Sequence, residues 1–153
     1  MPVLTVQNMP DTFKLAIVVS RFHGDITQKL LDGAVERLNE LGIPKDEVTI
    51  AWVPGAIEIP LTALRLARTE NYEAIVCLGA VIFGETKHFD YVCQQVSQGC
   101  QHVSLSENIP VIFGVLTTNN IEQAHDRTGG KKGHVGRQSI DAAFELVSVL
   151  RQI

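Results

Sequence analysis

The residues best suited to chemistry lie in one segment, between an apolar run and an amphipathic stretch. Residues 79–86, GAVIFGET, have the glycine and threonine spacing of a P-loop. Glu85, however, stands where a nucleotide-binding lysine is required, and a carboxylate at that place would repel a triphosphate. The intervening residues are also bulky rather than glycine-rich. The segment therefore does not indicate a nucleoside triphosphatase.

The same segment can still provide an anion site at the start of a helix. The amides of Gly84, Glu85 and Thr86 and the Thr86 hydroxyl could hold a single phosphate, because the first amides of a helix lack intrahelical acceptors. Alternatively, Thr86 only caps the helix, and the sequence leaves these two interpretations equal. His88 follows in the first turn, where an imidazole can exchange protons near neutral pH. A packed or surface histidine is the usual alternative, but strand end, helix start and anion site coincide here, which favours proton transfer.

Two further side chains follow apolar runs, and both could contact an organic ligand. Phe22 lies in a polar loop directly after such a run and could stack on a flat heterocycle, or it could anchor the loop. Glu58 lies at a strand-to-helix turn and could bind a polyol, or it could complement the helix dipole. The spacing leaves both pairs of alternatives open.

A basic, glycine-rich segment at residues 127–133 could bind an anion, or it could be a solvated loop. Arg127 lies far along the chain from Thr86. Geometry alone does not place both on one ligand within one subunit, although an oligomer could bring them together.

Composition limits the class of protein. The chain has 153 residues, 45% hydrophobic and 20% charged, which predicts one globular domain over residues 1–153. A net charge of −4 argues against nucleic-acid binding, and no apolar run approaches the ~20 residues that span a membrane. Residues 1–11 lack the pattern of a signal peptide, so we expect a cytoplasmic protein. We expect the three cysteines to be small buried side chains. The histidines do not have the spacing of metal ligands.

The elements that must position these residues alternate regularly. Four apolar runs, 15–19, 48–53, 74–78 and 111–116, are typical of strands covered on both faces. Helical patterns occupy residues 25–41, 57–68, 89–105, 121–126 and 136–150. This order predicts an α/β fold with a four-stranded parallel sheet and helices on both faces. Ligands bind such sheets at the carboxyl ends of the strands, where segments 20–24, 53–58, 79–88 and 117–120 should meet. Residues 1–11 are expected to form an N-terminal arm, whose strand-like segment 3–7 could pair with the sheet edge of another subunit.

From about residue 13 to residue 150, the chain resembles the lumazine synthase family. The matching stretches are residues 18–22, 52–60 (WVPGAIEIP), 79–92 and 110–120, and the runs WVPGAIEIP and GETKHFDYV (84–92) are highly specific. The resemblance implies a flavodoxin-like three-layer sandwich. It also implies an enzyme, a transferase of riboflavin biosynthesis that condenses 5-amino-6-(D-ribitylamino)uracil with 3,4-dihydroxy-2-butanone 4-phosphate and releases phosphate and water. No cofactor and no metal would be needed.

The resemblance also assigns roles to residues. His88 would transfer protons, Phe22 would stack on the pyrimidine, and Phe113 and Arg127 would reach in from a neighbouring subunit, Arg127 to the phosphate. The remaining implied contacts are Ala56, Ile57 and Glu58 to the ribityl chain, Ala80, Val81 and Ile82 to the pyrimidine edge, and Glu85 and Thr86 to the phosphate, with Lys131 as possible phosphate support.

Two positions depart from the pattern of many members, which have arginine where this chain has Phe83 and lysine where it has Val135. The first change would alter subunit packing or the rim of the site, and the second would leave phosphate binding more dependent on Arg127.

The resemblance implies pentameric rings, with decamers and icosahedral shells as larger assemblies and riboflavin synthase as a candidate partner. Three other interpretations are a non-catalytic flavin- or lumazine-binding module, a riboflavin synthase of related fold and a purely structural shell protein. The module and the riboflavin synthase would not need the intact run from Gly84 to His88.

Overall fold

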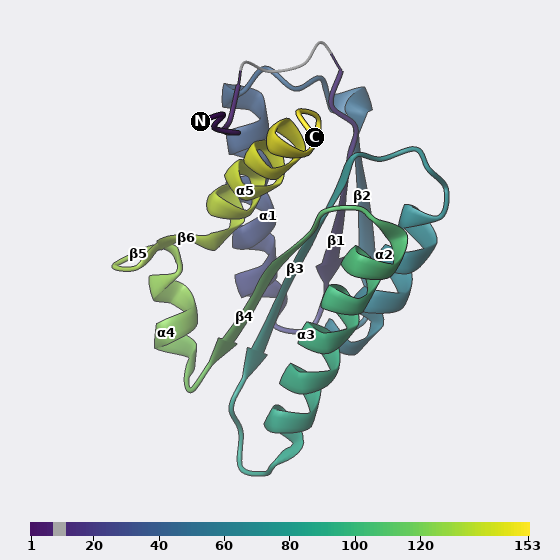
Figure 1. Ribbon diagram of the computed structural model, residues 1–153. Helices are drawn as coiled ribbons and strands as arrows, with labels where there is room; N and C mark the ends of the chain where they lie inside the picture. Colours follow the sequence, from purple (N-terminus) through teal and green to yellow (C-terminus); the bar gives the residue numbers. More distant parts are fainter. Residues whose placement is uncertain (8–11) are drawn as a thin grey trace.

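A four-stranded parallel sheet forms the centre of the computed structural model, which describes residues 1–7 and 12–153 (Figure 1). The strand order is β2-β1-β3-β4, so β1 and β3 are central and β2 and β4 are edges. The strands are β1 (Leu15–Ser20), β2 (Val48–Val53), β3 (Ala74–Ile82) and β4 (Val111–Thr118). In register, Val19 lies beside Trp52 on one side and Leu78 on the other, which brings the carboxyl ends of β2, β1 and β3 to one edge of the sheet.

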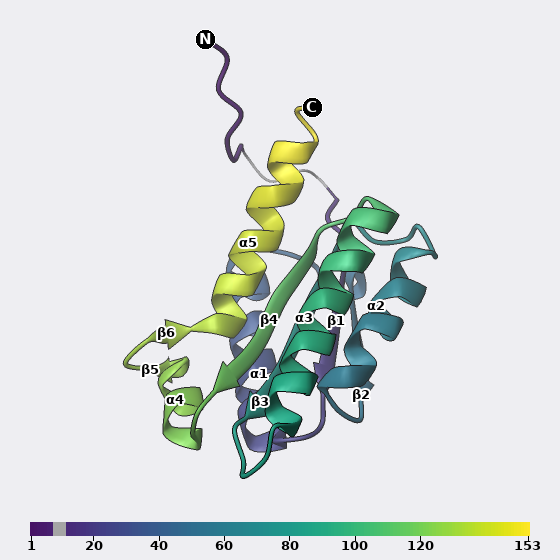
Figure 2. The ribbon, with the colours of Figure 1, turned by 60° about the horizontal axis from the view of Figure 1, so that its bottom comes forward.

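Helices cover both faces of this sheet, as predicted (Figure 2). On one face lie α1 (Gly24–Glu40) and α5 (Val135–Leu150); on the other lie α2 (Ile59–Ala67) and α3 (His88–Glu107). The remaining elements are short: the 3-10 turns η1 (Lys45–Glu47) and η2 (Ala56–Glu58), the helix α4 (Ile121–Asp126), and the hairpin of β5 (Thr128–Gly130) and β6 (Gly133–His134). Within the described residues, no helix combines the length and apolar character needed to cross a membrane.

The apolar core has two halves, one on each face of the sheet. Side chains of β1 alternate, so Leu15 and Ile17 pack under α1 and α5 while Ala16 and Val18 pack under α2 and α3. All six residues of β1 are buried, because both faces of this central strand are covered. The expectation of strands buried on both faces is therefore confirmed for β1 and for most of β3.

For the edge strands that expectation is wrong within the single chain. Ile50 and Trp52 of β2 are 42% and 39% exposed, and Phe113 of β4 is 41% exposed. An edge strand has a neighbour on one side only, and the pattern of apolar residues does not reveal which strands will be edges.

Several predicted element boundaries also differ. The predicted helix 57–68 begins as the turn η2 and becomes α-helical only at Ile59, where Pro60 occupies the first turn that proline favours. The helix predicted over residues 121–126 is confirmed with the same bounds, and the other three differ from the prediction by one or two residues at one or both ends. Residues 3–7 form no strand; the Gln7 amide instead donates to Ser148 Oγ of α5. Residues 8–11 of the predicted N-terminal arm lie outside the described residues.

Candidate active site

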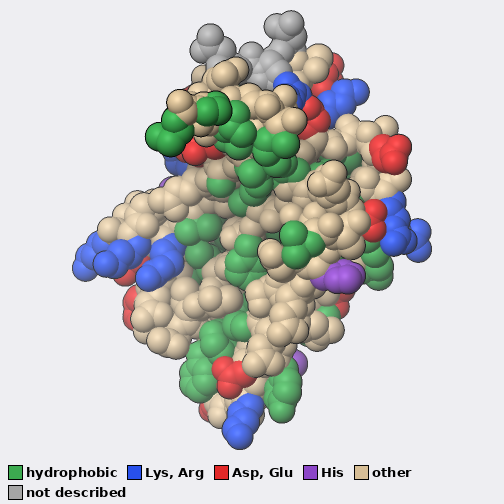
Figure 3. Space-filling view, in the orientation of Figure 1, with side chains coloured by type: hydrophobic (Ala, Val, Ile, Leu, Met, Phe, Trp, Pro, Cys, Tyr) green, Lys and Arg blue, Asp and Glu red, His purple; other side chains and the backbone are tan. Residues whose placement is uncertain are grey.

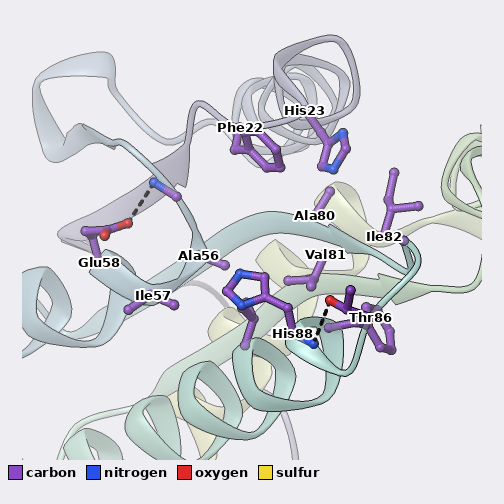
Figure 4. A pocket seen from close by; sticks show the side chains of 14 residues that line it. Phe22, His23, Ala56, Ile57, Glu58, Ala80, Val81, Ile82, Thr86 and His88 are labelled. Carbon is purple, nitrogen blue, oxygen red and sulfur yellow. Dashed lines mark hydrogen bonds between the residues drawn. The ribbon is translucent and has the colours of Figure 1, made fainter.

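The carboxyl ends of β2, β1 and β3 enclose one cavity of about 280 Å³. It lies beside the β1–β3 pair, where the chain order of the strands reverses direction, which is the place where ligands bind in doubly wound sheets. Its lining comes from the β1–α1 loop, from η2, from the end of β3 and from the start of α3 (Figure 4). Three of the four predicted segments thus meet here, whereas residues 117–120 do not line the cavity.

Phe22 and His23 form the wall that follows β1. The Phe22 ring is 67% exposed and lies 4.5 Å, centroid to centroid, from the tilted His23 ring. Hydrogen bonds from the Arg21 amide to Val53 O and from the Phe22 amide to Pro54 O extend the β1–β2 pairing into the loop and fix the base of this wall. An exposed aromatic ring on a fixed loop at a cavity mouth can stack on a flat ligand.

The turn after β2 presents Glu58 at the cavity. Its Oε2 accepts a hydrogen bond from the Gly55 amide at 2.9 Å, which is the half of a capping box that the third residue of a turn supplies. Ala56 and Ile57, between these two residues, also line the cavity (Figure 4). The carboxylate is thus oriented by its own turn and needs no other protein partner to hold it at the cavity.

The floor and the opposite wall come from β3 and α3. Ala80, Val81 and Ile82 form the floor, and His88 and Thr86 face Phe22 and His23 across it (Figure 4). The helix begins at His88 with Lys87 at the cap position, so the alternative in which Thr86 is the N-cap residue is wrong by one position. The Thr86 hydroxyl nevertheless accepts a hydrogen bond from the His88 amide at 3.3 Å, and its own proton remains available to an anion.

Four of the residues singled out from the sequence do not line the cavity. Glu85 is exposed outside the lining, and Phe113 lies in the middle of β4, opposite Cys77 of β3. The Arg127 guanidinium donates to Gln123 O at 2.9 Å, at the end of α4. Lys131 is exposed on the β5–β6 hairpin, over which basic side chains gather (Figure 3). Within one subunit, therefore, Phe113, Arg127 and Lys131 are not part of the cavity.

The sequence also missed several lining residues. His23 lies in the predicted loop, yet its side chain was assigned no role; its backbone is left-handed (φ 57°) and its ring makes no capping hydrogen bond to α1. Phe89 and Val92 line the cavity from the first turns of α3, and Phe83 packs edge-on against Phe89 at 5.6 Å. Phe83, one of the two departures from the family pattern, thus supports the rim of the cavity. The helical spacing from His88 could have identified Val92.

The described residues contain no cluster of three or more metal-ligating side chains. Cys77 and Cys100 are buried and Cys93 is partly buried, which confirms their interpretation as small packed side chains. The hydrogen bond that the Cys77 thiol donates to Cys100, together with burial, raises the pKa of Cys77 well above its ordinary value, so this thiol is not activated as a nucleophile. The titratable cavity side chains that remain for chemistry are the two histidines and Glu58.

Fold and cavity together define an α/β protein with a cavity at the switch point of a parallel sheet, lined by aromatic rings, two histidines and a carboxylate. Comparison with known proteins shows the family to which the chain belongs. The family model of 6,7-dimethyl-8-ribityllumazine synthase matches residues 12–151. The 6,7-dimethyl-8-ribityllumazine synthases of Coxiella burnetii strains CbuG_Q212 and RSA 493 / Nine Mile phase I are each 54% identical over 142 residues, covering 93% of this chain and 94% of the relative. The chain belongs to the 6,7-dimethyl-8-ribityllumazine synthase family.

Proposed function

We propose that this protein condenses 5-amino-6-(D-ribitylamino)uracil with 3,4-dihydroxy-2-butanone 4-phosphate to form 6,7-dimethyl-8-ribityllumazine, phosphate and water. The observation that carries the proposal is the cavity at the switch point, where Phe22, Glu58, Thr86 and His88 converge from separate segments. Family membership supports the same reaction.

Each wall of the cavity suits one part of these substrates. The exposed Phe22 ring can stack on the uracil, and Glu58, held by the Gly55 amide, can accept hydrogen bonds from ribityl hydroxyls. Ala80, Val81 and Ile82 can contact the edge of the uracil, while Thr86 can bind the phosphate. The amide of Glu85, which lies outside the lining, would contribute from the rim beside Thr86.

The substrate itself supplies the nucleophile. Its amine attacks the ketone, water leaves as the imine forms, phosphate is eliminated, and ring closure releases a second water. His88 is the group placed to move protons in these steps, and the protein otherwise orients the reactants. An enzyme-bound Schiff base at the exposed Lys87 is not required, because the amine comes from the substrate.

The second part of the proposal is that the site is completed in a homo-oligomer, a pentameric ring, by Phe113 and Arg127 of a neighbouring subunit. Apolar side chains are exposed on both sheet edges, and Arg127 lies outside the cavity of its own chain. Apolar surface of this kind is typical of protein interfaces. The proposal takes residues 1–153 as one domain acting in the cytoplasm, with residues 1–11 as an arm that pairs with the neighbour. Larger shells and a riboflavin synthase partner would build on the same ring.

The activity is tested by mixing purified protein with both substrates and following lumazine formation by absorbance. A reaction without protein is essential, because amine and ketone can condense unaided. Acceleration that is lost in His88→Ala but kept in His102→Ala, an exposed histidine further along the same helix, supports the proposal. Binding of the pyrimidine without any acceleration would instead indicate the non-catalytic binding module.

The shared site is tested by complementation between two inactive variants. His88→Ala and Arg127→Ala subunits are co-expressed, and the mixed assembly is purified and assayed. If the two residues come from different subunits, about a quarter of the sites in a random mixture regain both. If both residues served one site from the same chain, mixing would restore nothing, and native mass spectrometry confirms that the subunits have mixed.

A further inference from the structure

The imidazole ring of His134 packs between the start of α5 and the helix α1. His134 lies at the junction of β6 and α5. The ring lies directly against Gly33, in the middle of α1. A Cβ on Gly33 would stand 2.1 Å from His134 Cε1 and 2.3 Å from Nε2, far closer than atoms can approach. Glycine is unfavourable inside a helix, so its presence here provides the space that the ring fills.

The same ring also contacts the β5–β6 hairpin. His134 pairs with Thr128 across the hairpin, and a Cβ on Gly129 would lie 3.6 Å from His134 Cδ2. Gly129 has a φ of 101°, which a residue with a side chain rarely adopts. The imidazole thus lies between α1 and the strand that begins immediately after Arg127.

The backbone that follows His134 contacts both Arg127 and α1. The Val135 amide, one residue after His134, donates to Arg127 O at 2.8 Å. Gly136 follows, where a Cβ would stand 2.0 Å from Leu30 O, so the start of α5 presses against the backbone of α1. Any shift of His134 away from α1 must therefore move the backbone of Arg127.

The ion pairs between α5 and α1 are weaker constraints on this junction. Arg137 of α5 pairs with Glu36 at 3.4 Å and Glu40 at 2.7 Å on α1, but these are solvent-accessible ion pairs, which contribute little. His134 Nδ1 is buried and has no hydrogen-bond partner among the described residues. The close packing of the ring against Gly33 therefore fixes its place on α1.

We propose that His134 is a positioning residue for Arg127: its ring, seated on Gly33, sets the distance between α1 and the β5–β6 hairpin and so the place that the Arg127 guanidinium can reach. This inference rests on the proposed role of Arg127 in binding the phosphate of the second substrate. His134 itself contacts neither substrate.

The first test is His134→Ala, with His102→Ala as the matched loss of an exposed histidine. We expect the KM for the keto-phosphate to rise about three- to tenfold, because a displaced guanidinium loses phosphate binding. The kcat and the KM for the pyrimidine should stay unchanged. Arg127→Ala serves as the reference, and adding His134→Ala to it should raise the KM no further.

The second test uses Gly33→Ala, whose added methyl group occupies the seat of the ring. We expect it to raise the KM for the keto-phosphate and to speed hydrogen exchange at the amides of Val135 and Lys132, which donate to Arg127 O and Asp126 O. In a His134→Ala background the seat is vacant, so the same methyl should have no effect on KM or on exchange.

The outcomes separate this inference from the proposed function. If Arg127→Ala raises the KM and His134→Ala does not, His134 has no positioning role and the inference is overturned. An equal effect of Gly33→Ala with and without the imidazole overturns it as well. If Arg127→Ala leaves the KM unchanged, the role of Arg127 in the proposed function is wrong, and exchange at the Val135 amide alone then decides whether His134 holds the hairpin.

Discussion

Replacing Gly79 by alanine should distort the floor of the cavity and destabilise the fold. Gly79 lies in β3, and a Cβ there would stand 2.9 Å from Ser20 Oγ, 3.2 Å from Ile59 Cδ1 and 3.5 Å from Val115 Cγ1. Ser20 and Ile59 are fully buried, so neither can move into solvent. Overpacking of this kind costs about 1–3 kcal/mol. Because only one contact falls below 3 Å, we expect the free energy of unfolding to decrease by about 1.5 kcal/mol. Urea unfolding of both proteins at one fixed protein concentration measures this change.

The same substitution should weaken binding of the pyrimidine. Ser20 is two residues before Phe22, and Ile59 directly follows Glu58, so the added methyl pushes on both walls of the cavity. We expect a higher KM for the pyrimidine with a smaller change for the keto-phosphate. Steady-state kinetics with each substrate varied in turn measures this difference.

A double-mutant cycle with Ser20→Ala identifies the cause. The Ser20 hydroxyl is buried without a hydrogen-bond partner among the described residues, so Ser20→Ala alone should be neutral or slightly stabilising. In the double variant the closest contact is gone, and the Ile59 methyl at 3.2 Å can adjust. We expect a coupling energy of about 1 kcal/mol. Additive effects, or a Gly79→Ala protein as stable as the parent, would show that the Ser20 contact does not limit packing here.

Three other predictions concern the site and its surroundings. His88→Ala should lower kcat about 100-fold in the lumazine absorbance assay, while the affinity for the pyrimidine, measured by calorimetry, is largely kept. The reason is that this exposed side chain is proposed to move protons rather than to hold substrate. A loss of affinity as large as the loss of kcat would contradict that role. Glu58→Gln should raise the pyrimidine KM, since the carboxylate that the Gly55 amide holds at the cavity accepts stronger hydrogen bonds than a neutral amide does. An unchanged KM would remove Glu58 from the ribityl contacts. Burial, followed by the charge of Arg137, lowers the pKa of His134, so as the pH falls through about 6.5 the unfolded chain takes up a proton that the folded chain resists, and the free energy of unfolding decreases. The urea midpoint should therefore fall between pH 7.5 and 5.5, and less so in His134→Asn; equal slopes for the two proteins would exclude this linkage.

The central part of the fold followed from the sequence, because its cause is local. The apolar run of β1 is buried in full, and α1 begins and ends within one residue of its predicted bounds. The strand-end rule then placed Phe22, Glu58 and His88 near one another without knowledge of any family. Their separate positions in the chain are brought together by parallel pairing alone.

What the sequence did not reveal depends on strand order and on side-chain direction. The runs that form β2 and β4 have the same apolar pattern as those of β1 and β3, so nothing local marks them as edges. His23 was missed for another reason, since its left-handed backbone turns the ring toward Phe22 and no spacing rule predicts that turn. The edge strands carry apolar side chains on both faces, and some of these are exposed in the single chain. A subunit interface would require such a surface.

The substitution at Val135 changes how the hairpin can bind an anion. Where many family members have a lysine, the Val135 side chain packs against the core cluster under α1 and α5. A positive charge is thus exchanged for an apolar contact at the residue whose amide holds Arg127 O. On the proposed role of Arg127, the absence of that charge makes phosphate affinity depend more on where Arg127 lies. The proposed positioning by His134, whose ring packs on Gly33 one residue before Val135, would then matter more in this chain than in a member that keeps the lysine.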